Sequence, residues 1–95
     1  MRRNNNISFI CNPSLIIEIV SPSIQSHDIV TKLNVYMKYG VQEYWIGHPL
    51  LKSIQVYVLQ TDKTYVLQNI AKENEIASST LFHDFSVDVT KLFSI

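Results

Sequence analysis

Glu18 is the residue whose position in the sequence points most directly to chemistry. It stands inside the apolar segment 15–20, whose β-branched residues are typical of a strand covered on both faces. Burying a carboxylate there is costly unless it is paired or binds a metal ion. Because residues alternate sides along a strand, Glu18 could instead reach the rim of the sheet and stay solvated. The sequence leaves open both a metal-binding or catalytic role and a structural one.

Asp28 and Lys32 form a second feature, because they are spaced i, i+4 in a segment expected to be helical. The simpler interpretation is a surface ion pair that stabilises the helix by roughly 0.3–0.5 kcal/mol. In the alternative, Lys32 points back toward the end of the strand that carries Glu18. A lysine there can orient or deprotonate an attacking water and stabilise the charge that develops on a scissile phosphate.

The aromatic residues near these positions are ambiguous. Tyr36 lies one turn beyond Lys32 on the same helix face. Most tyrosines in helices pack through their ring and leave the hydroxyl in contact with solvent. Tyr44 and Trp45 could stack on nucleic acid bases, although aromatic residues in a strand are more often part of the core. The three histidines lack metal-ligand spacing and the single cysteine, Cys11, has no activating partner nearby. Phosphate-cradling glycine loops, dinucleotide fingerprints and serine nucleophile elbows do not occur.

The helix that must carry Lys32 is expected over 26–39. Ser26 or Asp28 can cap its start, and Gly40 is a typical residue beyond its end. The apolar residues recur at helical spacing, which predicts packing against a sheet: Ile29, Val30, Leu33 and Met37.

Alternating or β-branched segments predict the strands of that sheet: 7–11, 15–20, 43–46, 53–59, 64–70 and 75–78, with 87–93 as a strand or a last helical turn. The turn at 61–63 predicts an antiparallel hairpin, and the first strand–helix–strand unit can be parallel with a right-handed crossover. We therefore expect an α/β fold with a mixed sheet flanked by a helix, in a single domain over residues 1–95.

Composition limits the classes of function. The chain has 95 residues, 46% apolar and 17% charged, which is a normal globular mixture around one small core. Its formal net charge is 0, so DNA affinity would need a local patch or a metal ion. One cysteine allows no intrachain disulfide, and no apolar stretch approaches the roughly 20 residues that span a bilayer. We expect a cytoplasmic protein with no membrane segment and no signal peptide.

Several motifs occur in a fixed order along the chain: N-P-S-L-I-I-E-I-V-S-P-S at 12–23, the spaced Asp28, Lys32 and Tyr36, G-V-Q-E-Y-W-I at 40–46, and L-F-H-D-F-S-V-D at 81–88 with Leu92 and Phe93 after it. Together they resemble the Uma-type restriction endonuclease family, with its P-D-L-V-V-E-V-L-S-P-S, D-x-x-x-K-x-x-x-Y, G-V-x-E-Y-W-I-V-D-P and L-L-P-G-F-E-L-D segments. The resemblance covers residues 12–93. The combination is specific, whereas no single motif would be.

That family is similar to the PD-(D/E)xK nuclease superfamily, so the resemblance implies a restriction-endonuclease-like core that hydrolyses DNA with Mg²⁺ or Mn²⁺. Glu18 matches the strand glutamate that binds the metal. Val20 stands at the usual lysine position, so Lys32, the helix lysine of the family motif, takes the water-orienting role. Asp28 would position Lys32, and Tyr36 would support the site.

The chain also departs from the family pattern. Family members carry roughly another half-domain before this point, with the first metal-binding Asp, whereas no Asp precedes Asp28 here. Ser14 and His48 stand where the family usually has Asp. A single carboxylate holds Mg²⁺ poorly. We therefore expect a core lacking its N-terminal part, and two functions remain open: a DNA endonuclease, or a non-catalytic interaction module that forms a homo-oligomer through an exposed sheet edge.

Overall fold

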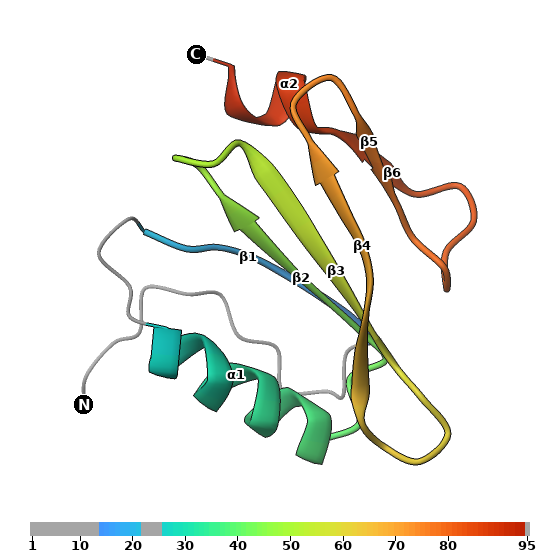
Figure 1. Ribbon diagram of the computed structural model, residues 1–95. Coiled ribbons are helices and arrows are strands. Elements are labelled where there is room, and N and C mark those ends of the chain that lie inside the picture. Colours follow the sequence, from blue (N-terminus) through green and yellow to red (C-terminus); the bar gives the residue numbers. More distant parts are fainter. Residues whose placement is uncertain (1–13, 22–25, 95) are drawn as a thin grey trace, which may run out of the picture.

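A mixed four-stranded sheet forms the centre of the protein. The computed structural model describes residues 14–21 and 26–94. The strands lie in the order β1-β2-β3-β4, with the bounds β1 Leu15–Ile19, β2 Glu43–His48, β3 Ser53–Leu59 and β4 Tyr65–Lys72. β1 pairs with β2 in parallel and the other neighbours are antiparallel (Figure 1). The predicted mixed α/β fold is confirmed, while the predicted strand at 7–11 lies outside the described residues.

Helix α1 (Ser26–Lys38) connects β1 to β2 and covers one face of the sheet (Figure 1). It carries Asp28 in its first turn and Lys38 in its last, which matches the helix dipole. Gly40 follows it with φ +76, a conformation that glycine adopts without steric cost. Ile29 and Leu33 pack against the sheet as predicted. Val30 was also predicted to face the sheet, but it is 53% exposed, since it lies about 100° around the helix from Ile29.

The hairpin of β3 and β4 turns where the sequence predicts it, at 61–63. The amide of Lys63 donates to the carbonyl of Gln60 (2.9 Å), and Asp62 Oδ1 accepts from both the hydroxyl and the amide of Thr64. These two hydrogen bonds lower the pKa of the Asp62 carboxyl. The turn is therefore stabilised locally, independently of the packing of the sheet.

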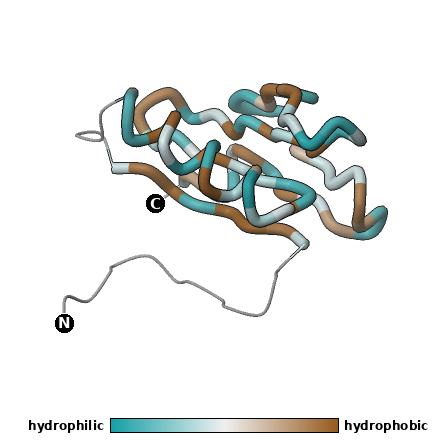
Figure 2. Tube along the Cα trace, turned by 90° about the horizontal axis from the view of Figure 1, so that it is seen from below, coloured by the Kyte–Doolittle hydropathy of each residue, from teal (hydrophilic) through white to brown (hydrophobic). Residues whose placement is uncertain are grey.

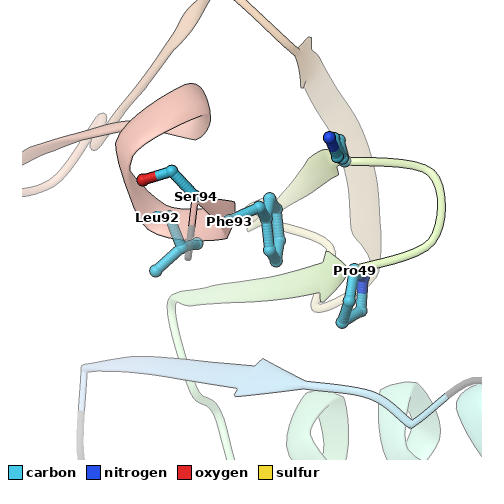
Figure 3. A pocket seen from close by; sticks show the side chains of 5 residues that line it. Pro49, Leu92, Phe93 and Ser94 are labelled. Carbon is cyan, nitrogen blue, oxygen red and sulfur yellow. The ribbon is translucent and has the colours of Figure 1, made fainter.

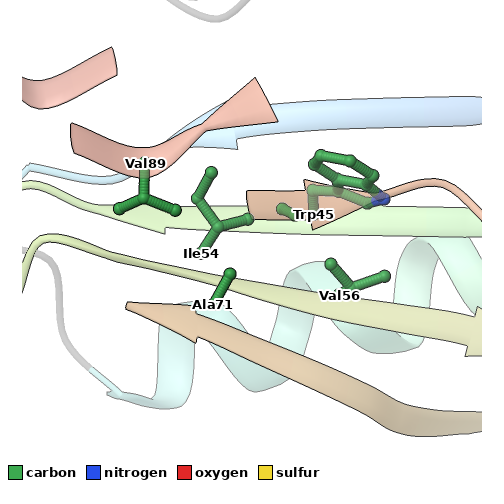
Figure 4. Packing of buried hydrophobic residues seen from close by; sticks show 6 residues of the cluster. Trp45, Ile54, Val56, Ala71 and Val89 are labelled. Carbon is green, nitrogen blue, oxygen red and sulfur yellow. The ribbon is translucent and has the colours of Figure 1, made fainter. Parts of the chain in front are cut away.

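The opposite face of the sheet is covered by the C-terminal segment. It forms β5 (Ile76–Ser78), β6 (Ser86–Asp88) and the short helix α2 (Val89–Phe93), which Asp88 caps by accepting a hydrogen bond from the Lys91 amide. The predicted strand at 75–78 is confirmed. Of the segment 87–93, which was expected to be a strand or a helical turn, the first two residues end β6 and the rest form α2. Six buried side chains form the core between these layers (Figure 4): Trp45, Ile54, Val56, Ala71, Ala77 and Val89.

Alternation along β1 and β2 assigns each residue to one face. Trp45 packs in the core on the side of β5 and β6, whereas Tyr44 and Ile46 pack in a second core beneath α1. Glu18 is the register partner of Ile46, so it also faces α1. Neither helix in the described residues is long and apolar enough to cross a membrane.

Candidate functional site

The carboxylate of Glu18 is the centre of a polar cluster beneath α1. Glu18 is 7% exposed, and its Oε2 accepts a hydrogen bond from the hydroxyl of Tyr36 (2.8 Å). Its Oε1 accepts one from the hydroxyl of Tyr44 (2.9 Å). The Nζ of Lys32 lies 3.3 Å from Oε1 and 3.5 Å from Oε2. Glu18 is therefore buried and paired, rather than solvated at the rim of the sheet.

Two elements bring the donors of this cluster to Glu18. Lys32 and Tyr36 are separated by four residues on α1, so both project from the same side of the helix. Tyr44 lies on β2, where the parallel register sets it opposite Ile16 and thus diagonally beside Glu18 on the same sheet face. The crossover helix and the strand register together converge three donors on one carboxylate.

Burial and the negative charge of Glu18 keep both tyrosines neutral. Burial is the main cause that raises the pKa of Tyr36 and of Tyr44, and the Glu18 carboxylate raises both further through its charge and the hydrogen bonds it accepts. The two rings pack with their centroids 4.8 Å apart. The raised pKa keeps both hydroxyls protonated further into the alkaline range, and each donates a hydrogen bond to Glu18.

Aromatic packing extends from this cluster across the sheet toward β4. The Tyr44 and Tyr65 centroids are 6.5 Å apart, and those of Tyr57 and Tyr65 are 6.3 Å apart. The hydroxyl of Tyr65 donates to the carbonyl of Val41 (2.7 Å), and burial raises the pKa of both Tyr57 and Tyr65. This row of rings makes a rigid support beside Glu18.

The structure brings together Glu18, Lys32 and Tyr36 of the predicted site residues, whereas Asp28 pairs with His27. Asp28 Oδ1 lies 3.2 Å from His27 Nε2, and its side chain is 47% exposed. Among the described residues, the ion pair of Lys32 is made with Glu18. Of the two arrangements considered for Lys32, the structure shows the one in which it points back to Glu18.

Tyr44 is a site residue that reasoning from the sequence did not find. The sequence suggested base stacking or core packing for it, and its ring is indeed fully buried. A buried tyrosine hydroxyl usually needs a hydrogen-bond partner, and this rule was the available signal. The identity of the partner depends on the register of β1 against β2, which the sequence does not specify.

Glu43 is a second buried carboxylate, but it lies on the other side of the sheet. It is 1% exposed and accepts hydrogen bonds from Trp45 Nε1 (3.1 Å), from the hydroxyl of Ser79 (3.0 Å) and from the amide of Leu81. These contacts bind the loop after β5 to β2. Glu43 therefore connects two layers of the fold, and its side chain faces away from Glu18.

The residues around Glu18 do not fit a magnesium ion within one chain. Mg²⁺ normally takes one or two carboxylates together with water and substrate oxygens in an octahedral arrangement. Here one carboxylate is present, and its oxygens already receive two hydroxyl donors and an ammonium group. Within 14–21 and 26–94, no group of three or more His, Cys, Asp and Glu side chains could hold a metal ion.

A pocket elsewhere on the protein is separate from this cluster. It lies where α2 meets the turn between β2 and β3, and Figure 3 shows side chains from both segments around it. Leu92 and Phe93 line it from α2, and Pro49 and Lys52 line it from the turn. None of the residues that contact Glu18 lines this pocket, so it belongs to a different part of the surface.

Comparison with known proteins gives a family and solved structures of similar fold. The Uma2 family model, described as "Putative restriction endonuclease", matches residues 2–90. No curated protein matches the chain. The fold is similar to the crystal structure of a "putative nuclease belonging to DUF820" from Anabaena variabilis ATCC 29413, with a TM-score of 0.67 at 21% identity. The match covers 90% of this chain and 46% of that one, so this chain spans less than half of its relative.

Proposed function

This chain belongs to the Uma2 family, and we propose on that premise that it forms part of a metal-dependent DNA endonuclease core of the PD-(D/E)xK type. The observation that carries the proposal is the contact between Lys32 Nζ and Glu18 Oε1 (3.3 Å), beside a buried cluster of apolar and aromatic side chains beneath α1. A buried carboxylate with a cation beside it is costly to build for packing alone, because apolar residues would fill the same space.

Lys32 is the group best placed to meet a phosphate. Its side chain is 27% exposed, whereas that of Glu18 is 7% exposed, so Lys32 is the more accessible member of the pair. Hydrolysis of a phosphodiester joins a water oxygen to phosphorus and breaks one phosphorus–oxygen bond, while negative charge builds on the phosphoryl oxygens. An ammonium group at that position orients the water and stabilises this charge.

Glu18, Tyr36 and Tyr44 supply the fixed part of the site. The two hydroxyls hold the carboxylate in one orientation, and Glu18 in turn holds Lys32. Mg²⁺ or Mn²⁺ belongs to the proposal only with a second carboxylate, because the described residues place one carboxylate in the cluster. Asp28, exposed beside His27, acts at most through the charge it adds to the first turn of α1.

A second candidate function is a non-catalytic interaction module. It is favoured by the apolar surface of the edge strand β1, where Ile17 is 38% and Ile19 is 49% exposed. In that case the Glu18 cluster stabilises the packing of α1 on the sheet and performs no chemistry.

Cleavage of supercoiled plasmid DNA with Mn²⁺ at low salt distinguishes the two functions. The protein, Glu18→Gln and the matched control Glu73→Gln are compared, since Glu73 is 53% exposed and pairs with Lys52 at the surface. We expect nicking by the wild type and Glu73→Gln and none by Glu18→Gln, with the same circular dichroism for all three. Cleavage by Glu18→Gln at the wild-type rate contradicts the assigned site, and no cleavage by any of them favours the interaction module.

A further inference from the structure

Among the described residues, β1 is an edge strand that lacks the usual protection. It ends the sheet order, and in the part of the chain that the structure describes it pairs with β2 alone. Natural edge strands carry lysine, proline or a bulge that discourages pairing with another chain. β1 reads Leu-Ile-Ile-Glu-Ile, and its one charge, Glu18, is turned into the cluster beneath α1. In Figure 2 this strand runs along the margin of the described chain and is hydrophobic except for a short hydrophilic stretch.

The other edge of the same sheet is built differently. The pairing of β3 with β4 shifts register between Val56 and Tyr57, and the shift leaves Gln68 of β4 without a partner in the ladder. Such a bulge twists an edge and interrupts its hydrogen-bonding pattern. Lys72 adds an exposed charge at the end of β4. Only one of the two edges is therefore suited to receive another strand.

We infer that β1 pairs with β1 of a second copy of this chain, antiparallel and centred on Ile17. In that register Ile17 lies opposite itself and Leu15 lies opposite Ile19, so one face carries an uninterrupted apolar row. On the face of α1, Ile16 lies opposite Glu18, so no like charges are directly opposed. The pattern of this strand is complementary to itself, which is what a two-fold interface requires.

The apolar row continues from β1 onto α2. A Cβ built at Gly47 would lie 2.6 Å from Ile19 Cδ1 and 3.4 Å from Phe93 Cζ, so these two side chains meet above that glycine. Leu92, the neighbour of Phe93, is 42% exposed. The surface beside the β1 edge thus offers apolar contacts in addition to backbone hydrogen bonds.

Disulfide trapping tests the strand register. In a Cys11→Ser background, Ile17→Cys, Ile19→Cys and Ile70→Cys are oxidised and separated by mass. Ile70 is the matched control, because it lies on β4 and is 39% exposed, against 38% for Ile17. We expect a covalent dimer from Ile17→Cys alone, since only that residue faces itself within disulfide reach. Equal trapping at Ile19 or Ile70, or none at Ile17, overturns the inference.

Sedimentation equilibrium tests the pairing in solution. The wild type and Ile70→Lys are expected to be dimers, and Ile17→Lys a monomer with the circular dichroism of the wild type. A monomeric wild type overturns the inference, and so does an Ile17→Lys variant that remains dimeric. Dimers that leave plasmid DNA intact contradict the proposed endonuclease and support the pairing.

Discussion

Glu18 and Glu43 are buried carboxylates on adjacent strands that face opposite sides of one sheet. Glu18 lies beneath α1 with Lys32 as its cation, and Glu43 lies beneath the C-terminal segment with neutral donors. They cannot share a ligand, because the sheet separates them. The environment of Glu18 therefore depends on groups that reach it from α1 and from β2.

Tyr44→Phe is expected to destabilise the protein by removing one hydrogen bond to a buried charge. Such bonds contribute about 1.5–3 kcal/mol, and phenylalanine keeps the packing of the ring. Tyr57→Phe is the matched control, because its hydroxyl donates to the neutral Gln55 amide oxygen at 3.3 Å. Urea unfolding of both variants measures the loss in free energy of unfolding. Equal losses would show that the hydrogen bond from Tyr44 to Glu18 contributes no more than the one from Tyr57 to Gln55.

Lys32→Ala is expected to slow plasmid cleavage on the order of 100-fold while changing Mn²⁺ affinity much less. Under the proposed function the ammonium would act on the phosphate and the water, whereas the Glu18 carboxylate would remain in place. Lys38→Ala, at the end of the same helix, serves as the control. A parallel loss of rate and of metal affinity would contradict the role given to Lys32.

Glu43→Gln is expected to lower the free energy of unfolding by about 2–3 kcal/mol. A glutamine amide has one acceptor oxygen, so its NH₂ group would face a donor that now contacts Glu43. The loop after β5 should open more often, which faster hydrogen exchange of the Leu81 amide would report. Glu73→Gln, at the exposed surface, should leave both thermal unfolding and this exchange unchanged.

Gly47→Ala is expected to change stability by less than about 1 kcal/mol, because two effects oppose each other. Alanine in a strand gains about 0.5–1 kcal/mol over glycine, while the new methyl group displaces Ile19 Cδ1, only 2.6 Å away, from its rotamer. On an Ile19→Val background that atom is absent, and the same substitution should be stabilising. Thermal unfolding of the four variants measures this coupling, and identical effects on both backgrounds would refute it.

The protein should lose stability at alkaline pH. Burial raises the pKa of Tyr36, Tyr44, Tyr57 and Tyr65, whereas in the unfolded chain tyrosines titrate near pH ~10. Above that pH the unfolded state binds fewer protons than the folded state, so the free energy of unfolding falls as pH rises. Urea unfolding at increasing pH, with tyrosinate absorbance as a second signal, checks this. Tyr44→Phe should show a shallower decline, and a pH-independent stability would exclude the effect.

The elements of the fold could be predicted because they follow from local patterns. The helix predicted over 26–39 is α1 at Ser26–Lys38, and the hairpin turns at 61–63, since helical periodicity and turn chemistry act between near neighbours. The same periodicity placed Lys32 and Tyr36 on one helix face. The choice between Asp28 and Glu18 as the partner of Lys32 was not local, because it depends on where α1 packs.

By itself, then, the sequence determined the secondary structure, the family pattern and the presence of a carboxylate within an apolar strand. The tertiary structure alone decided that Tyr44 joins Glu18 and that Glu43 does not. A strand's side chains alternate faces, but which face meets α1 and which residues lie opposite each other depend on the register of β1 against β2. These strands are connected through a helix, so their register is fixed by the packing of the whole sheet and not by a turn that can be read from neighbouring residues.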